Sequence, residues 1–439
     1  MNSNSAPSPA IVPLPTARPS RRRWWFLLLA LLVLPIAGVA SIEGWSYRQE
    51  RLARAALTEE RFDDAQHNAE AALRIRPRSA SVDLLAARIA RQRGDFALAE
   101  QYLSLCQQHG GISEPLQLEW LLLRCQRGEV DALAPLLWGA VDRGHSESAA
   151  ILETLAGAYI RQARYDEAQR ALDRWIQLDP QSARALESRG WLHNQLDQRE
   201  AAIADYERAL ELQPGRFAAR LRLAEVLVAS LQHAHALPHL ERLRSQQPDN
   251  PAVLVLLAQC WAALSRLDEA RALLDQVLAG NPDQFDALLQ RGNLDNTTGN
   301  YADAERWLRR ALEKSSGDPQ ARYSLYLSLE GQGNRQEEAK AELARWQEER
   351  KRRDRLTILL RTELPDHAGD PKLATEAGKL FLQIGETERG LFWLQRALAI
   401  DPRHAAAHQA LLAYFEGIGD TAKAEGHRRL AAAPAQPRQ

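Results

Sequence analysis

The chain has 439 residues, with 56 Lys and Arg against 57 Asp and Glu, which gives a formal net charge of −1. This balance excludes the strongly basic surface that binds nucleic acid, so we expect no nucleic-acid partner. Cys106, Cys125 and Cys260 form no C-x-x-C pair, and no zinc or redox motif is predicted. Cys106 and Cys125 either form a disulfide or are two small buried hydrophobes, and we favour the second interpretation.

The amino-terminal region has the composition of a tail followed by a membrane anchor. Residues 1–20 are rich in Pro, Ser and Ala, and we expect a disordered cytoplasmic tail. Arg21, Arg22 and Arg23 come next, and residues 24–42 carry no charge over 19 positions. As a helix these 19 residues would be about 28 Å long, close to the ~30 Å hydrocarbon core of a bilayer. Residues 21–45 are therefore predicted to form a single transmembrane anchor.

The direction of insertion and a rival interpretation both bear on localisation. The arginine cluster should stay cytoplasmic, which would send residues 46–439 across the membrane. A cleaved signal peptide is the alternative, with Gly38-Val39-Ala40 as a small-residue cleavage site. Both interpretations predict export, and Arg48, Arg51 and Arg54 weaken the charge asymmetry. We expect a single-pass protein of a bacterial inner membrane, with its bulk in the periplasm.

A fixed internal period organises the rest of the chain. Prolines stand at 180, 214, 248 and 282, which are 34 residues apart. The same frame predicts repeat units that begin at 46, 80, 114, 149, 183, 217, 251, 285, 320, 371 and 405. Proline disfavours helix at the preceding residue, so we expect it to end the second helix of each unit. The period therefore predicts helical hairpins in tandem.

Small residues recur at fixed positions of the unit, where two helices must approach closely. Position 20 is usually alanine, as at Ala202, Ala236 and Ala270, and position 8 is usually alanine or glycine. Position 15, in the link between the two helices, is often glycine, which suits a helix that ends in the left-handed conformation. These glycines are Gly94, Gly128, Gly299, Gly385 and Gly419.

The pattern resembles the tetratricopeptide repeat family over about residues 46–437. In the unit at 183 the matching residues are Leu186, Gly190, Ala202, Tyr206, Ala209 and Pro214. The units at 114, 285 and 320 depart from the pattern at position 32. The resemblance implies an all-α fold, a right-handed α-solenoid of helical hairpins, preceded here by the single transmembrane helix.

One segment breaks the 34-residue period, and it sets the predicted domain boundaries. Between the units at 320 and 371 there are 17 extra residues, 354–370. We expect the second helix of the unit at 320 to extend to about Glu363 and to end before Pro365. The predicted organisation is a repeat array of about nine units at 46–353, a helical extension or linker at 354–370, and a carboxyl-terminal pair of repeats at 371–437.

No constellation of residues predicts catalysis, a cofactor or a metal. There is no glycine-rich phosphate loop, no H-E-x-x-H and no G-x-S-x-G. His235 and His239 are four residues apart, as are His404 and His408, but their places in the repeat favour solvated or packing roles. We therefore expect a protein that is not an enzyme, with no small-molecule substrate.

The family resemblance also implies a concave groove, lined by positions 2, 5, 9 and 12 of each first helix. Side-chain amides there could pair with the backbone of an extended peptide, and a tryptophan could anchor it. The alternative is that these are merely solvated polar positions. The candidate residues are Arg184, Glu187, Trp191, Asn194, Glu225, Gln259, Asn293 and Asn296.

Two functions remain open at this stage. The first is a membrane-anchored scaffold or adaptor that binds polypeptide partners in its groove, for assembly of an extracytoplasmic or envelope complex. The second is an accessory subunit of an enzyme complex, such as a polysaccharide synthase or glycosyltransferase. Recovery of one catalytic partner in fixed stoichiometry would favour the second.

Overall fold

In the computed structural model, residues 43–367 and 369–431 are described, and they contain helices and no strand. The chain divides into two compact units, and the division falls between Glu129 and Val130 in the sequence. In the first unit a helix over 43–58 is followed by α2 (Phe62–Ile75), α3 (Ala80–Arg93), α4 (Phe96–Gly110) and α5 (Glu114–Gln126).

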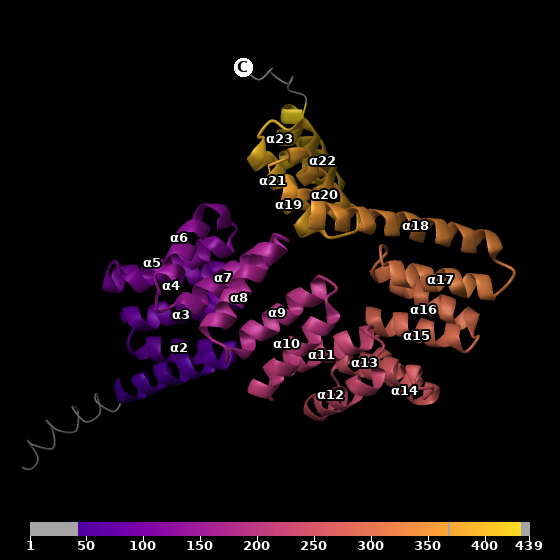
Figure 1. Ribbon diagram of the computed structural model, residues 1–439, viewed down its shortest axis with the longest axis horizontal. Coiled ribbons are helices and arrows are strands. Elements are labelled where there is room, and N and C mark those ends of the chain that lie inside the picture. Colours follow the sequence, from indigo (N-terminus) through magenta and orange to yellow (C-terminus); the bar gives the residue numbers. More distant parts are fainter. Residues whose placement is uncertain (1–42, 368, 432–439) are drawn as a thin grey trace, which may run out of the picture. The chain divides into compact units, whose positions relative to one another are not determined.

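The second unit begins at Val130 and continues the same hairpin pattern (Figure 1). Its first helices are α6 (Val130–Asp142), α7 (Ser148–Arg161), α8 (Tyr165–Leu178), α9 (Ala183–Gln195), α10 (Arg199–Leu212), α11 (Phe217–Ala229), α12 (His233–Gln246), α13 (Pro251–Ala263) and α14 (Leu267–Gly280). They are followed by α15 (Phe285–Thr297), α16 (Tyr301–Lys314), α17 (Pro319–Gly331), α18 (Gln336–Ile358), the π-helix η1 (Leu359–Glu363), α19 (Leu364–Asp366), α20 (Pro371–Gln383), α21 (Thr387–Ile400), α22 (Ala405–Gly417) and α23 (Thr421–Ala431).

Packing between consecutive helices makes this an all-α repeat solenoid, as the period predicts. In the unit that begins at Val130 the two helices of each hairpin from α7 and α8 to α22 and α23 contact each other, and the first helices α11, α13, α15 and α17 also contact their neighbours in that series. A continuous apolar core extends from Ala202 to Ala339, and each unit adds its small residues and leucines to it. Each hairpin thus hides its apolar side against the next one.

The residues that precede the periodic prolines show why the helices stop there. Asp179, Gln213, Gln247 and Asn281 follow the last residue of α8, α10, α12 and α14. Their φ angles lie between −135° and −139°, with ψ between 83° and 95°. Backbone in this conformation is not helical, so each of these helices ends before its proline, as the period predicts. Ser315 after α16 adopts the same conformation, with φ of −140° and ψ of 85°, and no proline follows it, so the proline is compatible with the stop but is not required for it.

Position 15 adopts the left-handed conformation whether or not it is glycine. Positive φ angles of 55° to 64° occur at Glu60, Ala163, Asp197, Leu231 and Ser265. In each case the repeat requires the conformation, because the next residue donates to a carbonyl five residues back, as Gln232 N does to Leu227 O at 2.8 Å. A side chain in this conformation costs about 1–2 kcal/mol, and the packing of the hairpin offsets that cost.

The unit predicted at 320 begins one residue earlier. Asp318 caps α17 by accepting from Ala321 N at 2.7 Å, and Pro319 is the first helical residue. The left-handed residue of the link is Gly333, with φ of 74°, which is position 15 counted from 319. The absence of a proline marker at the end of the preceding unit is the reason that the sequence placed this boundary imprecisely.

The extension after this unit is helical, but its end differs from the prediction. α18 ends at Ile358, η1 spans Leu359–Glu363, and α19 carries the helical path through Pro365 to Asp366. In an α-helix the proline ring would clash with the carbonyl four residues earlier. The wider π turn that directly precedes Pro365 accommodates the ring, so the helical path does not stop before it.

The predicted anchor over residues 24–42 lies outside the described residues, as does the predicted tail over 1–20. Among the helices that the structure describes, each is too short or too polar to cross a bilayer. Residues 43–45, which the sequence assigned to the end of the anchor, belong to the helix over 43–58.

A candidate peptide-binding groove

The first helices of four successive units surround a cavity of about 620 Å³, here called the amide cavity. Its walls come mainly from α11, α13, α15 and α17, with Leu231 of the link before α12, His233 at the start of α12, and Leu267 and Leu274 of α14. A volume of this size lies within the range of roughly 300–1,000 Å³ typical of ligand sites. Helix-to-helix packing therefore leaves a recess on the face formed by the first helices.

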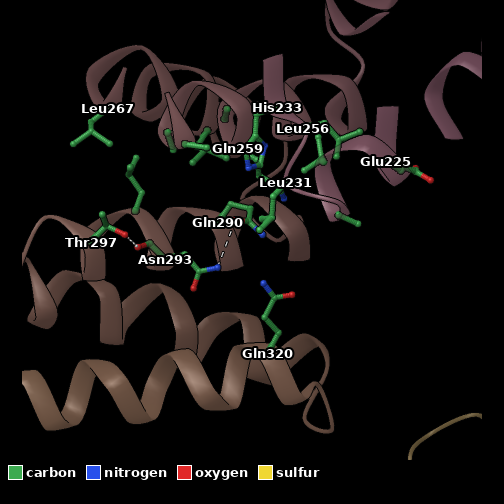
Figure 2. A pocket seen from close by; sticks show the side chains of 17 residues that line it. Glu225, Leu231, His233, Leu256, Gln259, Leu267, Gln290, Asn293, Thr297 and Gln320 are labelled. Atoms are coloured by element: carbon green, nitrogen blue, oxygen red, sulfur yellow. Dashed lines mark hydrogen bonds between the residues drawn. The ribbon is translucent and has the colours of Figure 1, made fainter. Parts of the chain in front are cut away.

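Side-chain amides provide most of the polar chemistry in the amide cavity. Figure 2 shows Gln259, Gln290, Asn293 and Gln320 around the same space, carried by α13, α15 and α17. Asn293 Nδ2 lies 3.5 Å from Gln290 Oε1, the long limit of a hydrogen bond. Within the described part of the chain, the amides of Gln259 and Gln320 make no hydrogen bond to protein. Each free amide offers two donors and an acceptor to a ligand.

The rest of the lining is apolar or weakly charged. Leu231, Leu256 and Leu267 supply apolar surface beside the amides. Glu225 is the acidic residue of the lining, and Arg222 Nη1 donates to its Oε2 at 2.8 Å. A ligand of the amide cavity would therefore be recognised through neutral hydrogen bonds and apolar contact, with little dependence on salt.

Three of the predicted groove residues, Glu225, Gln259 and Asn293, lie together in the amide cavity. Each is position 9 of its unit, so the repeat brings equivalent side chains to one face. Asn296 lies close by in sequence, but its amide joins α15 to α17. Its Nδ2 donates to Ser324 O at 2.9 Å, and its Oδ1 accepts from Ser328 Oγ at 2.7 Å.

The four predicted residues on α9 lie outside the amide cavity. Arg184 forms an ion pair with Glu153, and Glu187 accepts from Arg216 Nε at 2.7 Å, so both link neighbouring units. Trp191 is partly buried and packs against the apolar core, and Asn194 is half-buried. Whether any of the eight residues contacts a peptide stays a prediction.

Several lining residues were not among the candidates. Gln320 is position 2 of a unit that begins at 319, and the frame displaced by one residue hid it. Leu231 stands where other units carry glycine, and it is 80% exposed at the edge of the cavity. A large apolar residue at a position that requires a positive φ is a signal that the sequence does offer.

Other reactive groups are poorly placed for chemistry. Burial raises the pKa of the Cys260 thiol to about 11, and all three cysteines are buried and in no disulfide, so Cys106 and Cys125 pack as small residues. In the described ranges no cluster of three or more His, Cys, Asp or Glu side chains could hold a metal. His408, expected at the surface, is 3% exposed, because its Nε2 approaches Pro402 O at 3.0 Å.

The fold defines a helical-repeat protein built from consecutive hairpins. More particularly, residues 50–108 and 154–217 match one tetratricopeptide repeat family model, and residues 228–292 match another. These segments are tetratricopeptide repeats, and this fold generally forms non-enzymatic scaffolds for protein interactions. The helical hairpins of the described structure agree with the repeat pattern of the sequence.

Similar proteins share the repeat over limited lengths. A stretch of 75 residues is 32% identical to "Anaphase-promoting complex subunit 3" of Dictyostelium discoideum, and it spans 17% of this chain and 8% of that protein. A tetratricopeptide repeat protein from Parabacteroides merdae is 16% identical, with a TM-score of 0.36, over 65% of this chain and 99% of that chain. MamA from Desulfovibrio magneticus RS-1 is 20% identical, with a TM-score of 0.35, over 38% and 93%. YrrB, described as a TPR protein with an unusual peptide-binding site, is 18% identical, with a TM-score of 0.29, over 55% and 98%.

Proposed function

We propose that this protein is a non-catalytic adaptor that binds an extended polypeptide segment in the amide cavity. The observation that carries the proposal is the set of amides from three successive first helices around one recess. A peptide backbone presents alternating N–H and C=O groups, and an amide side chain can accept from one and donate to the other. The apolar lining beside them would take the peptide's side chains.

Selection of peptides from a random displayed library on the full-length chain tests this function. We expect binders whose affinity falls at least tenfold, about 1.4 kcal/mol, in the double variant Gln259→Leu/Asn293→Leu, because two backbone partners are lost. Their affinity should change little between low and high salt, since the cavity is nearly uncharged. Isothermal titration calorimetry would measure both effects.

The matched control is Gln276→Leu on the second helix α14, whose side chain bonds Asp249 and lies outside the amide cavity. This variant should bind the selected peptides as the unaltered chain does. Peptides that bind the double variant undiminished, or a library that yields no binder, would show that the cavity is not a peptide site.

The proposal extends to a membrane tether, with the repeats held outside the cytoplasm for assembly of an envelope complex. Its support is the uncharged stretch at 24–42 with arginines before it, a pattern typical of an anchor with a cytoplasmic amino terminus. The same composition supports a single-pass protein of a bacterial inner membrane.

A reporter enzyme that is active only outside the cytoplasm, fused after residue 439, tests the orientation. We expect activity from the full chain and none from the same fusion that lacks residues 1–45, because the export information lies in that segment. Membrane fractionation distinguishes a retained anchor from a cleaved signal. An inactive full-length fusion that is stably produced would contradict the exported location.

A further inference from the structure

A second cavity, of about 510 Å³, lies within the unit that begins at Val130, away from the amide cavity. It is formed where the extension after α18 meets the hairpin link before α8. Here Leu359 and Leu364 of the extension share an apolar core with Ala163 of that link and with Trp393 of α21. Segments about two hundred residues apart in sequence thus form its walls.

The lining of this cavity, here called the arginine pocket, combines cations with apolar surface. Arg164, Arg170, Arg361 and Arg396 line it, with Asp166 and Glu167 as the opposing carboxylates. The apolar part of the lining consists of Leu196, Leu360, Leu364, Pro365, Trp393 and the ring of Tyr165. Four guanidinium groups against two carboxylates leave an excess of two positive charges.

The carboxylates are unevenly shared among these arginines. Glu167 Oε1 pairs with Arg164 Nη2 at 2.6 Å, and Asp131 outside the pocket pairs with the same guanidinium. Among the described residues, Arg170, Arg361 and Arg396 form no ion pair. Glu167 and Asp131 thus both pair with Arg164, while Asp166, Arg170 and Arg361 are exposed to solvent and the partly buried Arg396 has no paired carboxylate in the described ranges.

Arg396 is the least satisfied of the four. Its Nη1 is buried and has no hydrogen-bond partner in the described part of the chain, while its Cζ lies 5.3 Å from the centre of the Trp393 ring. Burial, and then the like charge of Arg164, lower the pKa of the Arg396 guanidinium. Arg396 as a whole is only partly buried, but a buried donor that makes no hydrogen bond is rare in a native protein and points to a partner that the structure does not hold.

We propose that the arginine pocket binds a small amphiphilic anion, whose carboxylate or phosphate group pairs with Arg396 and whose apolar body packs on Trp393 and Tyr165. A guanidinium presents parallel N–H donors that match the oxygens of either group. The cavity volume suits a ligand of one or two rings. This site is independent of peptide binding in the amide cavity, and neither one requires the other.

Binding of phenylacetate, phenyl phosphate and the neutral phenylacetamide to the full-length chain tests the proposal, by calorimetry and by the shift in melting temperature. We expect at least one of the two anions to bind at least about tenfold more tightly than phenylacetamide, because the charge-assisted pair is lost with the amide. A preference between the anions would identify the group, carboxylate or phosphate, that the pocket takes. Binding should weaken as salt rises, since the attraction is between charges.

The variant Arg396→Gln should lose at least about tenfold in affinity for the anion that binds, without loss of fold, because it removes a partly buried cation that no carboxylate of the described residues pairs. Arg174→Gln, on α8 but outside the pocket, should bind as the unaltered chain does. Equal binding of phenylacetamide and the anions, anion binding that survives Arg396→Gln, or no anion binding at millimolar concentration would each overturn the proposal. The comparison of charged with neutral ligand needs no variant, so it decides the matter even if Arg396→Gln fails to fold.

Discussion

Replacing Arg189 with methionine is expected to lower the free energy of unfolding around α9 and α10 by about 3 kcal/mol. Arg189 holds Asp205 with two bonds, from Nε to Oδ2 at 2.9 Å and from Nη2 to Oδ1 at 2.7 Å. Its Nη1 also donates to Asp173 Oδ1 of the preceding unit at 2.9 Å. One guanidinium therefore ties three helices together.

The size of the expected loss follows from the burial of the partner. Asp205 is 6% exposed, so a carboxylate left without Arg189 would remain in a poorly solvated site. Removal of one member of such a pair typically costs more than the pair contributes when intact. The hydrogen bonds to Asp205 raise the pKa of the Arg189 guanidinium, in opposition to burial, which agrees with a charged pair.

Two further variants separate an unpaired charge from a simple loss of contacts. In Arg189→Met/Asp205→Leu no buried charge remains, and most of the lost stability should return. Arg306→Met removes a pair with Asp303 in which both side chains are mostly exposed, and it should cost less than about 0.5 kcal/mol.

Hydrogen exchange of the amides of α9 and α10 is the suitable measurement, because a repeat array does not unfold as one unit. Urea unfolding would supply the overall change. If the double variant were as unstable as Arg189→Met, the buried-charge explanation would fail.

The fold could be predicted well from the sequence because the same residue types recur at the same positions in many units. The proline at position 32, the alanine at position 20 and the frequent glycine at position 15 each have one physical reason, and the structure agrees with it in the units that carry these markers. Where a marker is missing the prediction weakens, as at Pro319, where the boundary was misplaced by one residue. Leu231 and Ser265 adopt the left-handed conformation although neither is glycine, and only their place at position 15 of the frame indicates it.

The cavities were less predictable than the helices. Gln259 and Asn293 could be predicted to lie together in the amide cavity, because both occupy position 9 and equivalent positions of a repeat face the same side. The arginine pocket had no such signal. Arg396 and Arg164 are 232 residues apart, and only the packing of the extension beside Ala163 brings them together.

The close approach of α20 and α21 leads to the second large effect, at Gly378. A Cβ added there would lie 2.7 Å from Leu394 Cγ and 3.0 Å from the carbonyl oxygen of Gly390. Gly390 is equally confined, since its own Cβ would lie 2.6 Å from Leu382 Cγ. These are positions 8 and 20 of the unit at 371, where the two helices cross. Other units have glycine at position 8, but only this unit has glycine at both positions.

We therefore expect Gly378→Val to destabilise the α20–α21 hairpin by about 3 kcal/mol, because its three added carbons meet a backbone oxygen that cannot rotate away. Gly426→Ala is the matched control, since a Cβ at Gly426 on α23 meets nothing within 4 Å. That change should raise stability by up to about 1 kcal/mol, as alanine favours helix over glycine. Hydrogen exchange in α20 and α21 would report the first effect, and the melting temperature the second. Equal tolerance of the two substitutions would mean that the helices can move apart at this crossing, and that close approach is not what selects glycine there.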